Sequence, residues 1–213
     1  MKLYNYYRSS SSYRVRIALN LKGIPWEYVA IHLARDGGEQ FKPKFQAVNP
    51  QFQVPVLELE VDGKLVRLSQ SLAIIEYLDE RWPDPPLLPK DALRRAKARQ
   101  LAEIVNSGIQ PLQNALVLRR VAALGADSKA WAREFIGLGL TAYEALIAGE
   151  PGPYSLGEQV SLPDLCLVPQ IMSARRMGLD LAPFPRCTSV EAACAALEPF
   201  QKAAPDQQSD SES

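Results

Sequence analysis

The chain has 213 residues, of which 47% are hydrophobic, and its 24 Lys and Arg residues are balanced by 24 Asp and Glu residues. This length and apolar content suffice for one large core or two small ones. The neutral balance gives no support to binding of nucleic acid or of an anionic membrane surface, because both need a basic excess. No apolar run approaches the roughly 20 residues of a membrane span.

The few cysteines and the single histidine limit the kinds of disulfide, metal site and catalytic triad that the chain could form. The three cysteines, Cys166, Cys187 and Cys194, form no CxxC pair, and the N-terminus begins with a strand pattern rather than a signal peptide. We therefore expect reduced thiols and a cytoplasmic protein. The single histidine, His32, ends an apolar run and is interpreted as a strand-end residue. One histidine excludes a His-rich metal site, so no metal is expected, and it makes a Ser-His-Asp triad improbable.

The first 80 residues alternate between strand and helix patterns. Asp62-Gly63 is the strongest hairpin signal and predicts a type I′ turn. Ser69 is a candidate helix cap, which would put Gln70 and Ser71 in the first turn of the helix. The order β-α-β-α-β-β-α predicts a small α/β domain. The expected strands are 2–6, 26–31, 54–61 and 65–68, and the expected helices are 15–21, an irregular 39–48 weakened by Pro43, and 72–78.

The rest of the chain is predicted to be all-helical. We expect a domain at 1–81, a proline-rich linker at 82–90, a helical domain at 91–202 and a disordered polar, acidic tail at 203–213. Ser161 and Asp164 form an S-x-x-D capping box, which we interpret as structural. The expected helices are 92–124, bent near Gly108 and Pro111, then 128–148, 161–178, bent at Pro169, and 189–200.

Four consecutive serines, Ser9 to Ser12, lie between Arg8 and Arg14 where the first strand passes into the first helix. The first turn of a helix has unpaired N–H groups and a partial positive charge, which favour anions, including a thiolate. Two interpretations remain open. One serine could simply cap the helix, or the cluster could be an anion or thiolate site. The start of the helix at Ser71 is a second candidate site for a carboxylate.

Several separated motifs together resemble those of the cytosolic glutathione transferases, and within them the zeta class, which includes maleylacetoacetate isomerases and is similar to bacterial maleylpyruvate isomerases. The motifs follow one another in the same order as in that family. They are Arg8-Ser9-Ser10 with Arg14-Val15-Arg16-Ile17-Ala18-Leu19, Asp36-Gly37-Gly38, Gln53-Val54-Pro55, the run from Gln70 to Leu78, the run from Gly108 to Asn114, and the run from Asp164 to Gln170.

The resemblance implies a thioredoxin-like first domain with a cis peptide bond before Pro55, and a homodimer. It also implies that glutathione is the cofactor, bound mainly by the first domain, with Gln110 and Asn114 lining the cleft from the helical domain. The cofactor-binding residues so implied are Ser9, Ser10, Ser11, Gln40, Gln53, Val54, Pro55, Gln70, Ser71, Gln110 and Asn114.

The implied reaction is cis-trans isomerisation of a maleyl-type diacid, in which the glutathione thiolate adds to the double bond, permits rotation and leaves. Ser9 is the expected main donor to the thiolate, with Ser10 second. Arg8 and Arg176 are the expected cations for the substrate carboxylates. Arg14 and Arg16, in contrast, are expected on a solvated or interface face of the helix.

The resemblance does not decide which maleyl-type diacid is the substrate. Ser11 replaces the cysteine usual in the zeta class, as in maleylpyruvate isomerases, whereas Gln110 matches maleylacetoacetate isomerases. Two other functions remain as alternatives. One is a glutathione transferase or dehalogenase acting on small electrophiles, and the other is a non-catalytic binding protein of the same fold.

Overall fold

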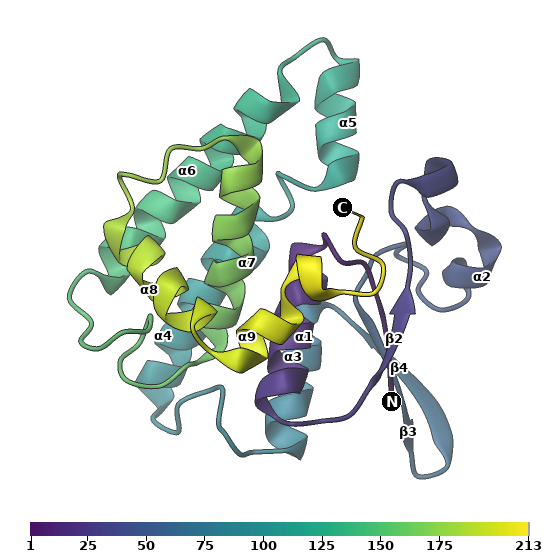
Figure 1. Cartoon of the computed structure of the whole chain (residues 1–213), viewed down its shortest axis with the longest axis horizontal. Helices are drawn as coiled ribbons and strands as arrows, with labels where there is room; N and C mark the ends of the chain where they lie inside the picture. The colour runs from purple at the N-terminus through teal and green to yellow at the C-terminus, as the bar shows by residue number, and fades with distance from the viewer. Residues whose placement is uncertain (213) are drawn as a thin grey trace. The chain divides into compact units, whose positions relative to one another are not determined.

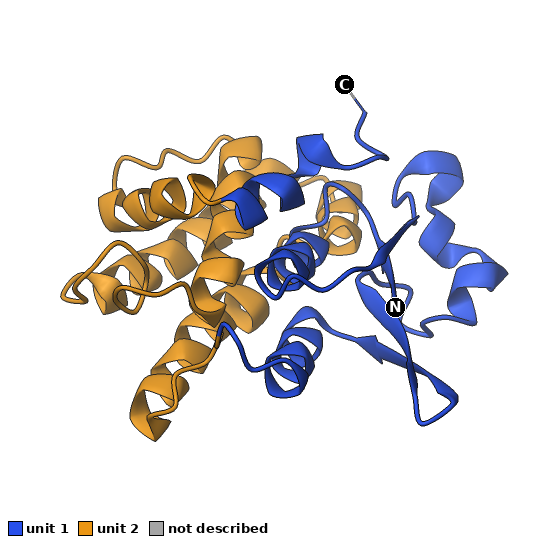
Figure 2. Ribbon diagram, turned by 60° about the horizontal axis from the view of Figure 1, so that its bottom comes forward, with its two compact units in different colours: residues 1–85, 198–213 blue, residues 86–197 orange. Residues whose placement is uncertain are grey.

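The computed structural model describes residues 1–212 and divides into two compact units (Figure 2). One unit comprises Met1–Pro85 together with the segment from Glu198 onward, and the other comprises Pro86–Leu197. Ser213, the end of the tail expected to be disordered, lies outside the described residues.

The first unit follows the expected order β-α-β-α-β-β-α, which is confirmed (Figure 1). Short 3-10 turns at Arg35–Gly37 and Glu39–Phe41 precede the second helix. The elements of this unit are β1 (Lys2–Asn5), α1 (Ser10–Leu21), β2 (Glu27–Ala30), α2 (Pro43–Gln46), β3 (Val56–Val61), β4 (Lys64–Ser69), α3 (Ser71–Arg81) and, at the C-terminal end, α9 (Glu198–Ala203).

The four strands form one mixed sheet in the order β2-β1-β3-β4. β1 pairs parallel to β2 and antiparallel to β3, and β3 pairs antiparallel to β4. Helices α1 and α3 pack together on one face of this sheet, and α2 lies on the other (Figure 1). This is the thioredoxin-like arrangement that the resemblance implies.

Alternation along the strands gives this unit two apolar layers. Leu3 and Leu57 are fully buried and pair directly across β1 and β3. On the other face, Tyr6, Phe45 and Val56 belong to a second buried cluster beneath α2. Because the sheet is covered on both faces, the loops at its ends are held at fixed positions.

Local turn chemistry is mostly as expected. Asp62 and Gly63 have φ angles of 51° and 73°, the positive pair that a type I′ turn needs, so this prediction is confirmed. The peptide bond between Val54 and Pro55 is cis, as the resemblance implied. Pro43 does not weaken α2 but begins it, because a proline at the first helical position loses no helical hydrogen bond.

Arg16 lies in the core, so the expectation of a solvated face on α1 is wrong. Its guanidinium is fully buried and donates to four oxygens. These are the side-chain oxygen of Asn5 at 3.1 Å and the carbonyls of Tyr6 at 3.3 Å, Tyr7 at 3.0 Å and Ala203 at 2.9 Å. Carbonyl dipoles therefore replace the water that the charge loses on burial.

The second unit is helical throughout its regular elements. The bend expected near Gly108 is a π-helical segment, Ile104–Ile109, followed by a turn. Gly178 ends α7 with a φ of 74°, the left-handed cap that glycine supplies without strain. The helices of this unit are α4 (Ala92–Glu103), α5 (Ala115–Ala123), α6 (Ser128–Ile147), α7 (Leu162–Met177) and α8 (Pro185–Ala195).

The C-terminal end differs from the single helix expected at 189–200. The structure has α8 and then α9, and α9 packs on α1 of the first unit. The following residues, expected to be disordered, form a 3-10 turn at Pro205–Gln207 and place Asp210 and Glu212 in hydrogen bonds with the first unit. Composition did not indicate this, because the partners of the two carboxylates lie about 180 residues away.

Within residues 1–212, the structure contains no helix with the length and apolar character that spanning a bilayer requires.

The network around Arg16 predicts a large effect on stability. Arg16→Met should lower the free energy of unfolding by about 3 kcal/mol, because several buried oxygens lose their donor together. Urea denaturation measures this change. Arg120→Met, at an exposed position on α5, is the control and should stay within about 0.5 kcal/mol of the wild type. Equal effects of the two substitutions would contradict the structural role of Arg16.

Candidate functional site

Ser9 is the cap of α1. Its backbone is extended, and its Oγ accepts a hydrogen bond from the backbone N–H of Ser12 at 3.2 Å. The N–H of Ser9 in turn donates to the carbonyl of Tyr6 at 3.0 Å, which closes the turn after β1. A serine that caps a helix uses an oxygen lone pair, so its hydroxyl proton remains available for another acceptor. Ser9 can therefore cap the helix and still donate to a ligand.

The other members of the serine cluster occupy the first turn of α1. Ser10 is buried and Ser11 is half-buried, while Arg8 is exposed in the turn just before the cap. The structure thus places one guanidinium and the hydroxyls beside the positive end of a 12-residue helix. This combination favours a bound anion.

Gln40 is held in a buried position by the turn before it. Its Nε2 donates to the carbonyl of Leu33 at 3.3 Å, and the residue is only 5% exposed. Its Oε1 has no hydrogen-bond partner among the described residues. A buried acceptor left unpaired costs about 1–3 kcal/mol, so a ligand that donates to this atom would be stabilised.

The turn that contains Gly37 and Gly38 leaves space for the side chain of Gln40. Gly38 has a φ of +106°, and a Cβ atom on it would lie 2.6 Å from Nε2 of Gln40. Gly37 also has a positive φ, +80°, but a Cβ atom there would meet nothing within 4 Å. Only the second glycine therefore makes space for the glutamine side chain.

The segment before β3 is shaped by a residue that sequence analysis missed. Asn49 is buried, its Nδ2 donates to the carbonyl of Gln53 at 2.8 Å, and its Oδ1 accepts from the N–H of Gln51 at 3.0 Å. Gln53 is exposed, whereas Val54 and Pro55 are buried. An asparagine beside a proline and a polar run is a recognised turn signal that could have identified this role.

The start of α3 corrects the expectation for Ser69. Gln70, not Ser69, is the cap residue, because β4 extends through Ser69. Gln70 has φ 72° and ψ 115°, an unfavourable conformation for a residue with a side chain, and its Nε2 donates to Oε1 of Gln51 at 3.0 Å. Strained backbone of this kind is concentrated at ligand sites.

Ser71, the first residue of α3, is linked to α1. Its Oγ accepts a hydrogen bond from Nη1 of Arg14 at 3.2 Å, and both residues are buried. The expectation that Arg14 is solvated is therefore also wrong. As with Ser9, the hydroxyl proton of Ser71 remains available to a carboxylate at the start of the helix.

The remaining candidates belong to the second unit. Gln110 follows the π-helical segment, and Asn114 caps α5 by accepting the N–H of Leu116 at 2.9 Å. Between them Gln113 pairs with Gln170 of α7, with Nε2 of Gln113 donating to Oε1 of Gln170 at 2.6 Å. This partly buried amide pair links the turn that carries both candidates to α7.

Two adjacent arginines, Arg175 and Arg176, lie near the end of α7 and are both exposed. Arg175 forms an ion pair with Glu191 of α8, with Nη2 2.6 Å from Oε2. This bond raises the pKa of Arg175. Arg176, the sequence candidate, is exposed in the last turn of the same helix. Arg175 therefore joins two helices of its own unit.

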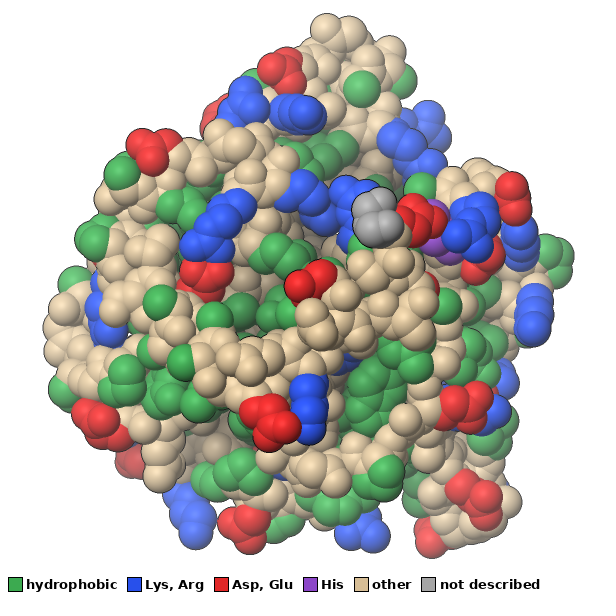
Figure 3. Space-filling view, viewed as in Figure 1, with side chains coloured by type: hydrophobic (Ala, Val, Ile, Leu, Met, Phe, Trp, Pro, Cys, Tyr) green, Lys and Arg blue, Asp and Glu red, His purple; other side chains and the backbone are tan. Residues whose placement is uncertain are grey.

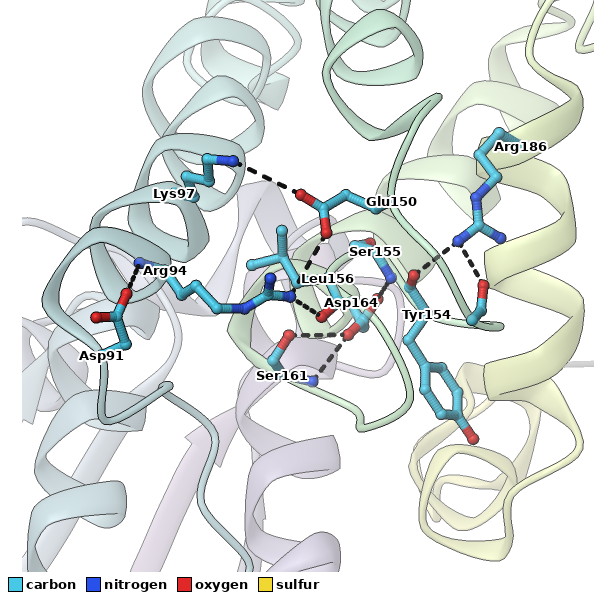
Figure 4. Close-up of polar contacts among 11 residues, drawn as sticks. Asp91, Arg94, Lys97, Glu150, Tyr154, Ser155, Leu156, Ser161, Asp164 and Arg186 are labelled. Atoms are coloured by element: carbon cyan, nitrogen blue, oxygen red, sulfur yellow. Dashed lines mark hydrogen bonds and ion pairs between the residues drawn. The ribbon is translucent and has the colours of Figure 1, made fainter.

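The capping box at the start of α7 is structural, as expected. Asp164 is fully buried, and its carboxylate accepts from the N–H groups of Ser155 and Ser161, both at 2.8 Å (Figure 4). Burial raises the pKa of Asp164, and these hydrogen bonds oppose the rise. The carboxylate ties the loop after α6 to the helix. In residues 1–212 no three His, Cys, Asp or Glu side chains are grouped so as to hold a metal ion.

Comparison with known proteins gives matches along the whole chain. The family model described as the N-terminal domain of glutathione S-transferase matches residues 8–81. The maleylacetoacetate isomerase of Rattus norvegicus is 46% identical over 98% of this chain and 94% of its own length. The maleylpyruvate isomerase of a Ralstonia species is 48% identical over 99% of this chain and 100% of its own length.

Solved structures agree with these matches. A holo maleylpyruvate isomerase, described as a bacterial glutathione S-transferase of the zeta class, has a TM-score of 0.93 and 47% identity, with all of both chains covered. A maleylacetoacetate isomerase from Anaeromyxobacter dehalogenans, with dicarboxyethyl glutathione and citrate bound in its active site, has a TM-score of 0.90 and 49% identity. That match covers 100% of this chain and 97% of the other.

The two glycines before Gln40 allow a matched test of the glutathione-binding residues. Gly38→Ala should displace the Gln40 side chain and weaken glutathione binding about tenfold, roughly the free energy of one hydrogen bond to a buried group. Calorimetric titration with glutathione measures the affinity. Gly37→Ala imposes similar backbone strain without the contact, and its effect on affinity should be smaller. Equal losses would show that backbone strain, not the position of Gln40, controls binding.

Proposed function

The chain belongs to the glutathione S-transferase family, in its zeta class, and from that premise we propose that it is a glutathione-dependent cis-trans isomerase of a maleyl-type diacid. The observation that carries the proposal is similarity along both units at once. The relatives named as isomerases match 98–99% of this chain, not only the first unit. The substrate is maleylacetoacetate or maleylpyruvate, and the pathway is catabolism of an aromatic amino acid or an aromatic ring.

The residues of the first unit fit glutathione. When bound, glutathione supplies the thiolate nucleophile, so the chain itself needs none. Gln40 presents a buried, unpaired oxygen to an N–H donor at one end of the tripeptide. Gln70 and Ser71 bind the γ-glutamyl carboxylate where α3 begins, and the backbone of Val54 pairs with the glutathione cysteine.

Ser9 acts on the thiol. Its hydroxyl proton is not used by the helix cap and is donated to the sulfur, which lowers the pKa of the thiol. The helix end contributes about 0.3–1 kcal/mol more, rising to roughly 2 kcal/mol where water is partly excluded. Ser10 is the second donor, and Ser11 fills the space of the cysteine that zeta-class members usually carry.

Cationic side chains select the diacid. Arg8, exposed beside the capped end of α1, and Arg176, in the last turn of α7, bind the two carboxylates. The planar guanidinium suits bidentate carboxylate binding and can stabilise negative charge that develops during isomerisation. Gln110 and Asn114 are the further glutathione-binding residues that we propose.

Membership of the zeta class also leads us to propose an oligomeric state and a cellular compartment. The protein is a homodimer, because zeta-class members usually pair, and light scattering in solution tests this. It works in the cytoplasm, where thiols remain reduced, and its three cysteines are buried, with no disulfide between them in residues 1–212.

An assay of the purified protein on maleylacetoacetate and on maleylpyruvate, with and without glutathione, tests the proposed function. We expect turnover of one of them only with glutathione present. Conjugation of an apolar electrophile without isomerisation of either diacid would instead support a transferase or dehalogenase. Absence of glutathione binding would support a non-catalytic member of the fold.

Ser9 is expected to control the ionisation of the thiol. Ser9→Ala should lower kcat by about 10²–10³, the effect of removing one donor to a developing anion. The pH profile of kcat/KM should also move to higher pH, because a thiol without its donor ionises less readily. Ser9→Thr, which keeps both the cap and the donor, should retain most activity. An unchanged pH profile in Ser9→Ala would assign the donor to another residue.

Arg176 and Arg175 form a matched pair for the substrate site. Arg176→Met should reduce isomerisation of the diacid by about 10²-fold, since a charged carboxylate contact is lost, and should spare conjugation of an apolar electrophile. Arg175→Met removes the ion pair with Glu191 and should lower thermal stability slightly while isomerisation persists. Loss of isomerisation in Arg175→Met alone would reverse the assignment of the two arginines.

A further inference from the structure

The segment after α9 carries two carboxylates, Asp210 and Glu212, that accept hydrogen bonds from residues near the start of the chain. Asp210 accepts hydrogen bonds from the hydroxyl of Tyr28 and, at 3.2 Å, from the backbone N–H of Tyr7. Tyr7 lies two residues before Ser9, in the turn that leads into α1. Burial, with the bond to Asp210 as the next contribution, raises the pKa of Tyr28, so its hydroxyl stays a donor at neutral pH.

Glu212 contacts the segment that follows β2. Its Oε1 lies 3.0 Å from Nε2 of His32 and 3.1 Å from Nη2 of Arg35. His32 is only 8% exposed, and its Nδ1 accepts the backbone N–H groups of Ala34 at 3.2 Å and Arg35 at 2.7 Å. Because Nδ1 is an acceptor, the ring proton must be on Nε2, which donates to Glu212. The space-filling view shows the purple histidine between acidic and basic side chains (Figure 3).

His32 also closes the loop that carries Gln40. Its N–H donates to Oε2 of Glu39 at 2.8 Å, and its carbonyl accepts from the N–H of Glu39 at 2.8 Å. The next residue is Gln40, whose side chain returns to the carbonyl of Leu33. The imidazole therefore fixes the turn through hydrogen bonds from its backbone N–H groups, and the side-chain carboxylate of Glu212 in turn fixes the imidazole.

We propose that the C-terminal segment is a positioning element for glutathione, in which Asp210 holds the turn before Ser9 and Glu212 holds the loop before Gln40. Neither carboxylate touches the tripeptide, and both act through the backbone that presents its ligands. The inference rests on the proposed function, because it assigns glutathione to Ser9 and Gln40. It goes further in making residues beyond the last helix part of cofactor recognition.

The contacts suit a positioning role better than a role in global stability. The Glu212 side chain is 54% exposed, and exposed ion pairs contribute little to unfolding free energy. A loop that is fixed before binding does not lose its conformational freedom when the ligand arrives. Removal of the two carboxylates should therefore weaken glutathione binding while the fold persists.

The test is the full-length double variant Asp210→Asn with Glu212→Gln. We expect the Kd and KM for glutathione to rise about fivefold, with kcat changed less than twofold, because one exposed ion pair and the hydrogen bonds to one part-buried carboxylate together have effects of this size. Asp206→Asn is the matched control, since this carboxylate lies in the same segment and bonds to the neighbouring Gln207. Its glutathione affinity should equal that of the wild type.

Ionic strength separates positioning by charge from simple packing. At high salt the affinity of the wild type should fall part of the way toward that of the double variant, because the exposed Glu212–Arg35 ion pair is screened whereas the hydrogen bonds accepted by Asp210 are not. A double variant with wild-type affinity, or with lowered kcat and unchanged KM, would overturn the inference and leave the proposed function intact. A wild-type protein that binds no glutathione would overturn both. A thermal melt of each variant shows that its fold is retained.

Discussion

The first unit depends on a buried guanidinium that binds backbone. The guanidinium of Arg16, on α1, donates hydrogen bonds to three backbone carbonyls. Two belong to Tyr6 and Tyr7, which precede the helix, and the third belongs to Ala203, at the end of α9. Burial lowers its pKa to about 10, so it is charged at neutral pH and keeps all its donors. One side chain thus fixes where the chain enters α1, and so where Ser9 caps it. The same side chain anchors the helix from which the C-terminal segment departs.

Around this anchor, the candidate site consists of backbone conformations that few residues adopt readily. Gly38 and Gln70 have positive φ angles, and Gln70 has a side chain that makes its conformation costly. Asn49 holds the loop before Val54 by two hydrogen bonds to backbone. The surrounding sheet and helices stabilise these conformations, so ligand groups are presented before a ligand arrives. Such pre-organisation reduces the entropy lost on binding.

Sequence reasoning succeeded where the determining contacts are local. The hairpin at Asp62-Gly63 and the capping box of Ser161 and Asp164 depend on residues within three positions of each other, and the structure has both. It failed where a side chain is satisfied from far along the chain. The burial of Arg16 depends on a carbonyl 187 residues away, and the order of the C-terminal segment on partners at Tyr28 and His32. No periodicity records such contacts.

The serine cluster was ambiguous for a different reason. A cap and a thiolate donor are alternatives only if a hydroxyl makes a single hydrogen bond, but a hydroxyl can accept through its lone pairs and donate its proton at the same time. Ser9 accepts from the N–H of Ser12 and keeps its proton, and Ser71 accepts from Arg14 and keeps its own. The bond that each hydroxyl accepts limits its rotation and so directs its proton. In both helices the structural role therefore leaves the hydroxyl proton for the binding role that we propose, and the two interpretations of the cluster are compatible.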